Sequence, residues 1–148
     1  MPKTFESLSL QDAKRMLAAG EAKADQIGLP YNIAVVDAAG HLLAFSRQDG
    51  ALIASIDLAI HKAFTARACD MSTGDLAELA QPGKPLYGIQ YSNTGKIVIF
   101  GGGLPIRRKG VVIGAIGTSA GTVEQDIAVA EAAAEVFEPS IQSAAVGA

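Results

Sequence analysis

The amino-acid sequence predicts an α+β fold in which amphipathic helices cover a mainly antiparallel sheet. Two β-rich runs, residues 31–37 and 41–47, are joined by Asp-Ala-Ala-Gly, which is typical of a hairpin turn. Apolar residues at helical spacing precede and follow this hairpin. Because tight turns join neighbouring strands, we expect an antiparallel sheet of about five strands. The 148 residues contain no repeat or linker and predict one domain, residues 1–148.

The chain begins with a short arm, residues 1–8, followed by the first helix. The Ser9 hydroxyl can cap this helix, and Asp12 supplies the reciprocal bond of a capping box. Gly28 ends the helix before Leu-Pro.

The residues after the hairpin predict a second helix at 53–69 and a short third helix at 72–80. Ser55 is the candidate N-cap of the second helix. Residues 81–96 form a loop that is long for a compact domain, so we expect it to have a functional or interface role.

The C-terminal half predicts strands at residues 96–100 and 111–119. Thr122 and Gln125 have capping-box spacing at the start of a last helix. After this helix the chain is polar and rich in Ala, so we expect the core to span about residues 8–137.

Composition and charge exclude several classes of protein. Charged residues make up only 18% of the chain, which favours a homo-oligomer with apolar subunit interfaces. A net charge of −3 argues against nucleic-acid binding. The N-terminus resembles no signal peptide and no apolar run could span a membrane, so we expect a cytoplasmic protein. With one cysteine and no cluster of ligands, we expect no metal site.

Glycines are concentrated between residues 101 and 121. The run Gly101, Gly102 and Gly103, followed by Leu104 and Pro105, predicts an irregular turn whose bare backbone can edge a binding pocket. A second set (Gly114, Gly117 and Gly121) predicts close packing of a helix on a strand. Neither set has the spacing of a phosphate-binding loop or of a dinucleotide fingerprint.

Two pairs of side chains are candidates for chemistry. Asp57 and His61 are four residues apart on one helix face. His61 could therefore act as a haem ligand, a metal ligand or a general base. The alternative is a surface histidine that forms a favourable pair with Asp57. Arg47 and Asp49 stand at the end of the second strand, where they can bind a carboxylate or form a rim salt bridge.

Four stretches together resemble one known family: "VVDAAGHLLAFSRQDGA", "SIDLAIHKAFTA", "GGGLPI" and "GVVIGAIGTSAGTVEQDIAVAEAA". They are similar to the GlcG/HbpS family, also called haem-degrading or DUF336 domains. The resemblance covers roughly residues 8–137. It implies a profilin-like fold, with a central antiparallel sheet and helices on both faces, and a homo-oligomer.

The resemblance also implies a single pocket between the second helix and the Gly-rich loop. The family pattern falls on Arg47, Asp49, Gly50, Lys62, Thr65, Gly102, Gly103, Pro105, Gly117 and Asp126. Haem-binding relatives place a histidine on or near the first helix, whereas this chain has none before His41. Haem bound through His61 would therefore be a different arrangement.

Three functions remain open at this point. The resemblance implies a small-molecule protein of catabolism, either an enzyme or an accessory binder. In that role Arg47 or Lys62 would hold a carboxylate, and the backbone amides of the Gly101–Pro105 stretch would polarise a carbonyl. Asp49, His61 or Asp126 would then move a proton. Alternatively the chain binds or degrades haem, with His61 or no residue as axial ligand and Arg47, Lys62 or Arg107 at the propionates. The third alternative is an oligomeric scaffold without catalysis.

Overall fold

A β-hairpin forms one side of the central sheet. The computed structural model, which describes residues 1–137, pairs β1 (Asn32–Asp37) with β2 (Leu42–Arg47) in antiparallel register. The Asp37 carboxylate accepts hydrogen bonds from the backbone N–H groups of Ala39 (2.9 Å) and His41 (3.0 Å), and these bonds fix the turn. The predicted hairpin is confirmed.

A second pair of strands completes the sheet. β3 (Gly103–Arg108) pairs with β4 (Val111–Ser119), and β4 also pairs with β1. The described residues thus form a four-stranded antiparallel sheet in the order β2-β1-β4-β3, with β2 and β3 at its edges.

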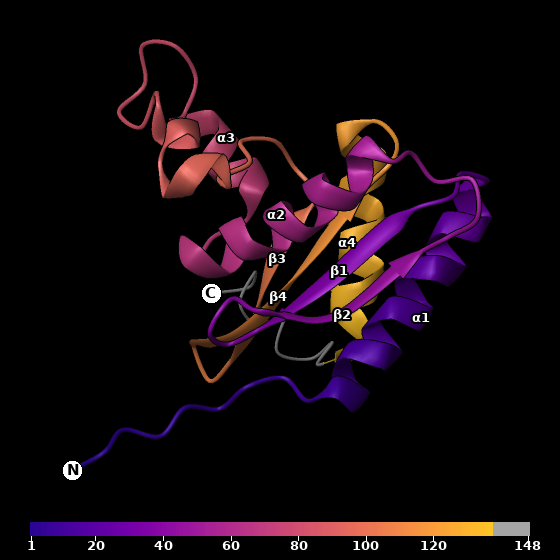
Figure 1. Cartoon of the computed structure of the whole chain (residues 1–148), viewed down its shortest axis with the longest axis horizontal. Coiled ribbons are helices and arrows are strands. Elements are labelled where there is room, and N and C mark those ends of the chain that lie inside the picture. The colour runs from indigo at the N-terminus through magenta and orange to yellow at the C-terminus, as the bar shows by residue number, and fades with distance from the viewer. Residues whose placement is uncertain (138–148) are drawn as a thin grey trace.

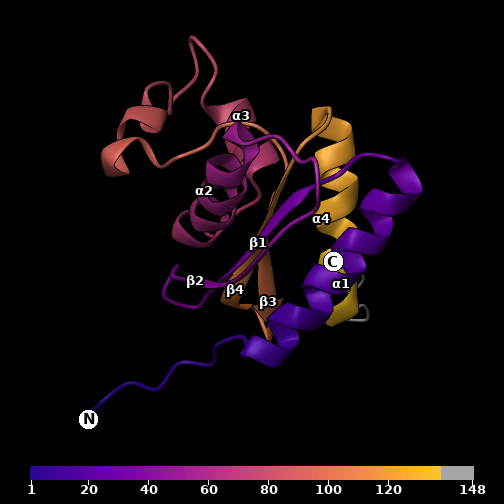
Figure 2. The same cartoon turned by 45° about the vertical axis from the view of Figure 1, so that its right-hand side comes forward.

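Two helices cover one face of the sheet, α1 (Leu10–Ile27) and α4 (Val123–Phe137). Figure 2 shows them on the side of the sheet opposite α2. Both predicted capping boxes are present, the first at Ser9 and the second between Thr122 and Gln125. This face buries most of the large apolar side chains, among them Met16, Ile33, Ile106, Ile116 and Val129.

The other face is covered by α2 (Ala54–Ala68), which packs through small residues. Ala59 and Ala63 are fully buried, and a methyl group at Gly117 would lie 2.5 Å from the Ala63 nitrogen. Only glycine therefore lets α2 approach β4 this closely, so the prediction of close helix packing holds at Gly117. It is wrong for Gly114, where a methyl group would meet Leu8 and the Val36 carbonyl oxygen, and for Gly121, where it would meet Gln125 and Leu29. The N-cap prediction is wrong: Ile53 occupies that position without a side-chain cap, and Ser55 is buried inside the helix.

A small lobe projects from the body beside α2 (Figures 1 and 2). It contains α3 (Thr73–Leu79) and two short 3₁₀ turns, η1 (Ile89–Tyr91) and η2 (Asn93–Gly95).

The predicted strand at residues 96–100 is wrong, and the strand forms further along. Ile97 and Val98 are buried, but the Val98 N–H donates to the Thr65 hydroxyl of α2 (3.0 Å) rather than to a neighbouring strand. Pairing begins at Gly103, so Gly103 and Pro105 belong to β3 rather than to a turn. Proline is tolerated there because β3 is an edge strand.

The two ends of the chain differ in what the structure describes. Residues 1–7 are an exposed arm that runs away from the body (Figure 1). The predicted C-terminal tail lies outside the described residues. In the part of the chain that is described, each helix is too short or too polar to cross a membrane.

Candidate functional site

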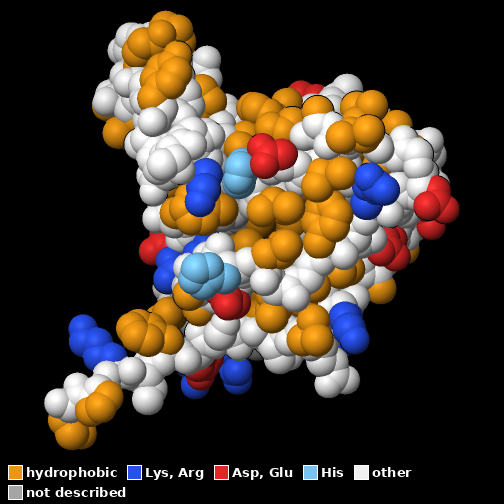
Figure 3. Space-filling view, in the orientation of Figure 1, with side chains coloured by type: hydrophobic (Ala, Val, Ile, Leu, Met, Phe, Trp, Pro, Cys, Tyr) orange, Lys and Arg blue, Asp and Glu red, His pale blue; other side chains and the backbone are white. Residues whose placement is uncertain are grey.

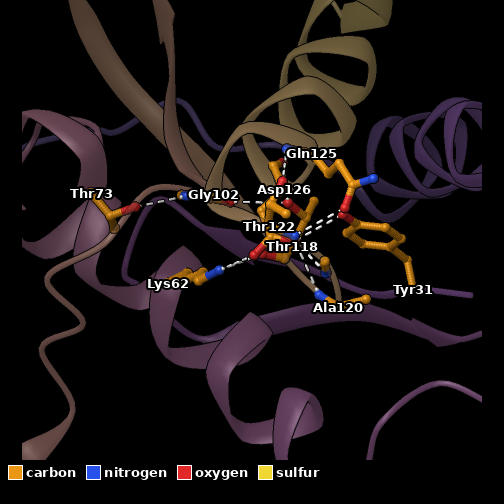
Figure 4. Close-up of polar contacts among 11 residues, drawn as sticks. Tyr31, Lys62, Thr73, Gly102, Thr118, Ala120, Thr122, Gln125 and Asp126 are labelled. Atoms are coloured by element: carbon orange, nitrogen blue, oxygen red, sulfur yellow. Dashed lines mark hydrogen bonds and ion pairs between the residues drawn. The ribbon is translucent and has the colours of Figure 1, made fainter. Parts of the chain in front are cut away.

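A buried ion pair joins α2 and α4, the helices on opposite faces of the sheet. Lys62 of α2 and Asp126 of α4 are almost completely inaccessible, and the lysine Nζ donates to Asp126 Oδ2 at 2.7 Å (Figure 4). Nζ also donates to the carbonyl oxygen of Thr118 on β4 (2.9 Å). Burial lowers the pKa of Lys62 from the usual lysine value, and the hydrogen bond and charge of Asp126 oppose this effect.

The other carboxylate oxygen of Asp126 organises the start of α4. Oδ1 accepts hydrogen bonds from the Tyr31 hydroxyl (2.8 Å) and from the backbone N–H groups of Ala120 (3.1 Å) and Gly121 (3.0 Å). Burial, with the adjacent carboxylate, raises the pKa of Tyr31 well above its usual range. The negative charge also lies in the first turn of α4, where the helix dipole favours it.

The glycine run closes over this pair. Gly102 has a φ of 121°, and a methyl group there would lie 2.8 Å from Lys62 Nζ. A methyl group at Gly103 would lie 2.5 Å from the Lys62 carbonyl oxygen, and one at Gly101 would lie 2.7 Å from the Ile127 side chain. The three glycines therefore allow the backbone to lie directly between α2 and α4.

The outer side of the glycine run faces a pocket of about 540 Å³. Its apolar part comes from β3, α4 and the residues just before the glycines, and its rim comes from α3. Three exposed carboxylates, Asp75, Glu78 and Glu131, line the pocket. The full lining is Ser72, Gly74, Asp75, Ala77, Glu78, Gln81, Ile99, Phe100, Gly101, Gly102, Gly103, Leu104, Val123, Ile127 and Glu131.

Several predicted site residues lie together around the buried ion pair and the glycine run. Lys62, Gly102 and Asp126 are in mutual proximity, as described above. Thr65, one helical turn after Lys62, is buried and donates to the Lys96 carbonyl oxygen (3.2 Å), so it holds the segment that leads to the glycines. Pro105 is half-buried on β3 opposite Ala115.

Arg47 and Asp49 lie elsewhere in the chain. Both are exposed and line a separate hollow of about 630 Å³ beside the end of α1, together with Glu21, Asp25 and Gln48. They are at the same end of the sheet as the glycine run, but β2 and β3 are opposite edges. Three strand spacings amount to roughly 14 Å, so within one chain the two groups contribute to different hollows.

His61 lies on the face of α2 that points away from the sheet. Its Nδ1 is 3.0 Å from Asp57 Oδ2, and its side chain is 23% exposed. Phe64, one turn further, is half-buried, and Lys96 Nζ lies 5.8 Å from the centre of its ring. Figure 3 shows both histidine side chains of the chain on this face, with hydrophobic side chains around them. The described residues contain no group of three or more metal-binding side chains.

Three residues of the site were not singled out by sequence reasoning. Tyr31 directly precedes the apolar strand β1, Thr118 contributes a backbone oxygen, and Phe100 places its ring centre 4.8 Å from Lys62 Nζ. Position along a strand or loop carries no signal for such contacts. The acidic rim on α3 follows only from how that helix packs against β3.

Comparison with known proteins agrees with the motifs. The family model described as "Haem degrading protein HbpS-like" matches residues 8–135. An uncharacterized 15.0 kDa protein from the dhaT-dhaS intergenic region of Citrobacter freundii is 46% identical over 131 residues, which cover 88% of this chain and 92% of that protein.

Solved structures show the same fold. Klebsiella pneumoniae protein ORFY, assigned to DUF336, has a TM-score of 0.90 and 40% identity, covering 92% of this chain and 94% of that one. The PduOC:heme complex has a TM-score of 0.85 and 38% identity, covering 88% of this chain and 95% of that one.

Proposed function

Because the chain belongs to the HbpS-like family, we propose that it binds a small ligand in the pocket bounded by Gly101–Gly103, α3 and α4. The main support for this proposal is the glycine wall, the backbone of Gly101–Gly103. These residues have no side chains where they lie between the pocket and the Lys62–Asp126 pair. A wall of bare backbone beside apolar side chains is a common form of small-molecule site.

We assign the ligand to the small oxygenated or carboxylate compounds of catabolism that the family resemblance implied. Part of the wall is already used internally, because the Gly103 N–H donates to the Thr73 hydroxyl (2.9 Å) and the Gly102 carbonyl accepts from the Thr118 N–H (2.9 Å). The N–H groups of Gly101 and Gly102 are therefore the wall's candidate donors. Asp126 already accepts four hydrogen bonds, which supports a positioning role rather than proton transfer.

Amide NMR of the full chain tests this proposal. Titration with 1,2-propanediol and with propanoate should shift the Gly101, Gly102, Val123 and Ile127 signals saturably for at least one of them. Saturable shifts confined to Arg47, Gln48 and Asp49 would contradict it, because they would place the ligand in the hollow beside α1.

Haem binding is a second candidate, on the outer face of α2. The carboxylate of Asp57 beside Nδ1 favours a proton on that nitrogen, which leaves Nε2 of His61 with the lone pair that iron ligation requires. Phe64 would contact the porphyrin and Lys96 would meet a propionate. When bound, haem would supply redox chemistry. The solved PduOC:heme complex of a relative supports this candidate.

A hemin titration followed at the Soret band tests the second candidate. His61→Ala should abolish a saturable spectral shift, whereas His41→Ala, a matched change at an exposed turn, should retain it. An equal shift in wild type and His61→Ala would exclude His61 as the ligand.

We also propose that the chain is a homo-oligomer, through the face formed by α2 and β2. Ile53, Leu52 and Leu42 are 78%, 61% and 50% exposed, and Figure 3 shows hydrophobic side chains gathered on this side. Burying them in a subunit interface would remove this apolar surface from water. Light scattering should show dissociation in Ile53→Asp and not in Val111→Asp, which changes an equally apolar exposed residue at the distant β3–β4 turn.

A further inference from the structure

The Lys62 ammonium has one N–H for which the described residues provide no oxygen. An ammonium group carries three N–H donors. Two of them are used, by Asp126 Oδ2 (2.7 Å) and by the Thr118 carbonyl (2.9 Å). The remaining partner is the ring of Phe100, whose centre lies 4.8 Å from Nζ. A ring face attracts a cation, but an oxygen acceptor satisfies a buried N–H better.

Phe100 separates this amine from the pocket. Its side chain lines the pocket and is 37% exposed, so it can move toward solvent without disturbing the core. Next to it, Gly102 has no side chain that could shield Nζ, since a methyl group there would lie 2.8 Å from that atom. The ring and the glycine backbone are thus the barrier between Nζ and a ligand.

The charges around the pocket disfavour an anion. The positive charge of Lys62 is matched by the Asp126 carboxylate in direct contact with it. The residues that line the pocket include Asp75, Glu78 and Glu131 and no Lys, Arg or His. A carboxylate ligand would be repelled by the rim without an unmatched cation to attract it.

We propose that the pocket takes an uncharged compound with a carbonyl or hydroxyl oxygen, and that this oxygen displaces the Phe100 ring and accepts the third N–H of Lys62. This inference rests on the proposed small-ligand function and names the class of its ligand. Of the two ligand classes in the proposed function, the inference favours the uncharged oxygenated compound. It rejects the carboxylate that Arg47 or Lys62 was expected to hold.

Propanamide and propanoate form a probe pair of matched shape and different charge. Followed through the Gly101 and Gly102 amides, propanamide should bind about tenfold more tightly than propanoate, the ratio expected for repulsion of about 1.4 kcal/mol. In Glu78→Gln/Glu131→Gln the difference should shrink because propanoate binds better, whereas the affinity for propanamide should stay the same.

Phe100→Leu tests the displacement without leaving Asp126 unpaired, which a change at Lys62 itself would do. Removing the ring removes the competitor for Nζ, so propanamide should bind more tightly to Phe100→Leu than to wild type. Weaker binding would overturn the displacement, because it would show that the ring packs against the ligand.

The outcomes separate this inference from the function on which it rests. Equal or tighter binding of propanoate would overturn the inference and leave the small-ligand function standing. Absence of a saturable shift with either probe, in a folded protein, would overturn the proposed pocket and the inference with it.

Discussion

Lys62 and Asp126 are 64 residues apart in the sequence and their charged atoms are 2.7 Å apart in the fold. The pair joins α2, on one face of the sheet, to α4 on the other, and it passes beside the glycine run at the β3 edge. Buried charges are tolerated only when they are paired and hydrogen-bonded. Lys62 and Asp126 meet this condition, because each makes further hydrogen bonds besides the one between them.

Lys62→Met should reduce the free energy of unfolding by about 3–5 kcal/mol, because Asp126 Oδ2 loses its partner while the carboxylate remains buried. Urea denaturation measures this loss. Adding Asp126→Asn should recover part of it, since the amide oxygen can still accept from Tyr31 and the Ala120 N–H without carrying a charge. A double variant that loses the sum of the two single effects would show that the residues are not coupled.

Tyr31→Phe should change the stability of the protein at alkaline pH. The pKa of Tyr31 is raised in the folded state, so the unfolded chain releases the tyrosine proton first, near pH 10. The contribution of Tyr31 to stability is thus complete below about pH 10 and is lost as the pH rises further. The free energy of unfolding should fall less steeply above that pH in Tyr31→Phe than in wild type. Because Lys62 is present in both proteins, the comparison isolates the tyrosine, and identical slopes would refute the assignment.

Gly117→Ala should destabilise the fold by about 1–3 kcal/mol or more, because the added methyl group meets the backbone of α2 at Ala59 and Ala63. Thermal unfolding measures the effect. Gly74→Ala is the matched control, since in α3 the methyl group makes only ordinary contacts of 3.9 Å and alanine favours a helix. If both variants melted at the same temperature, close packing of α2 on β4 would not be the reason for glycine.

Thr65→Val should cost about 1–3 kcal/mol by leaving the buried Val98 N–H without its acceptor. Thr65→Ser, which keeps the hydroxyl, should lose much less. Hydrogen exchange at Val98 provides a local readout: the amide should exchange faster in the valine variant alone. Unchanged protection in Thr65→Val would mean that this hydroxyl does not hold the segment before the glycines.

Local patterns in the sequence predicted the parts of the fold that local forces determine. The capping boxes at Ser9 and Thr122 and the Asp37 turn each satisfy backbone groups within a few residues, so their spacing is visible in the sequence. The prediction of a strand at 96–100 was wrong because the apolar residues there are buried against α2. A short apolar run is equally compatible with a buried strand and with a segment packed against a helix.

The candidate site could not be predicted from the sequence alone, because it depends on the order of the strands in the sheet. The motifs marked Lys62, Gly102 and Asp126. They did not show that the Phe100 ring lies beside the lysine amine or that α3 adds acidic side chains to the pocket, because both features arise from packing between distant segments. Arg47 and Asp49 carry the same kind of motif, and the strand order places them on the opposite edge strand from the glycines. Sequence spacing carries no information about which edge a strand occupies.

If the ligand lies against the glycine wall, a large side chain placed inside that pocket should block its binding. Ala77→Trp places a large side chain on α3 inside the pocket, whereas Leu79→Trp adds the same ring to an exposed α3 position outside the lining. Propanamide titrations should show binding to wild type and Leu79→Trp, and loss of at least about tenfold in affinity in Ala77→Trp. Equal affinity for all three proteins would show that the ligand binds outside this pocket.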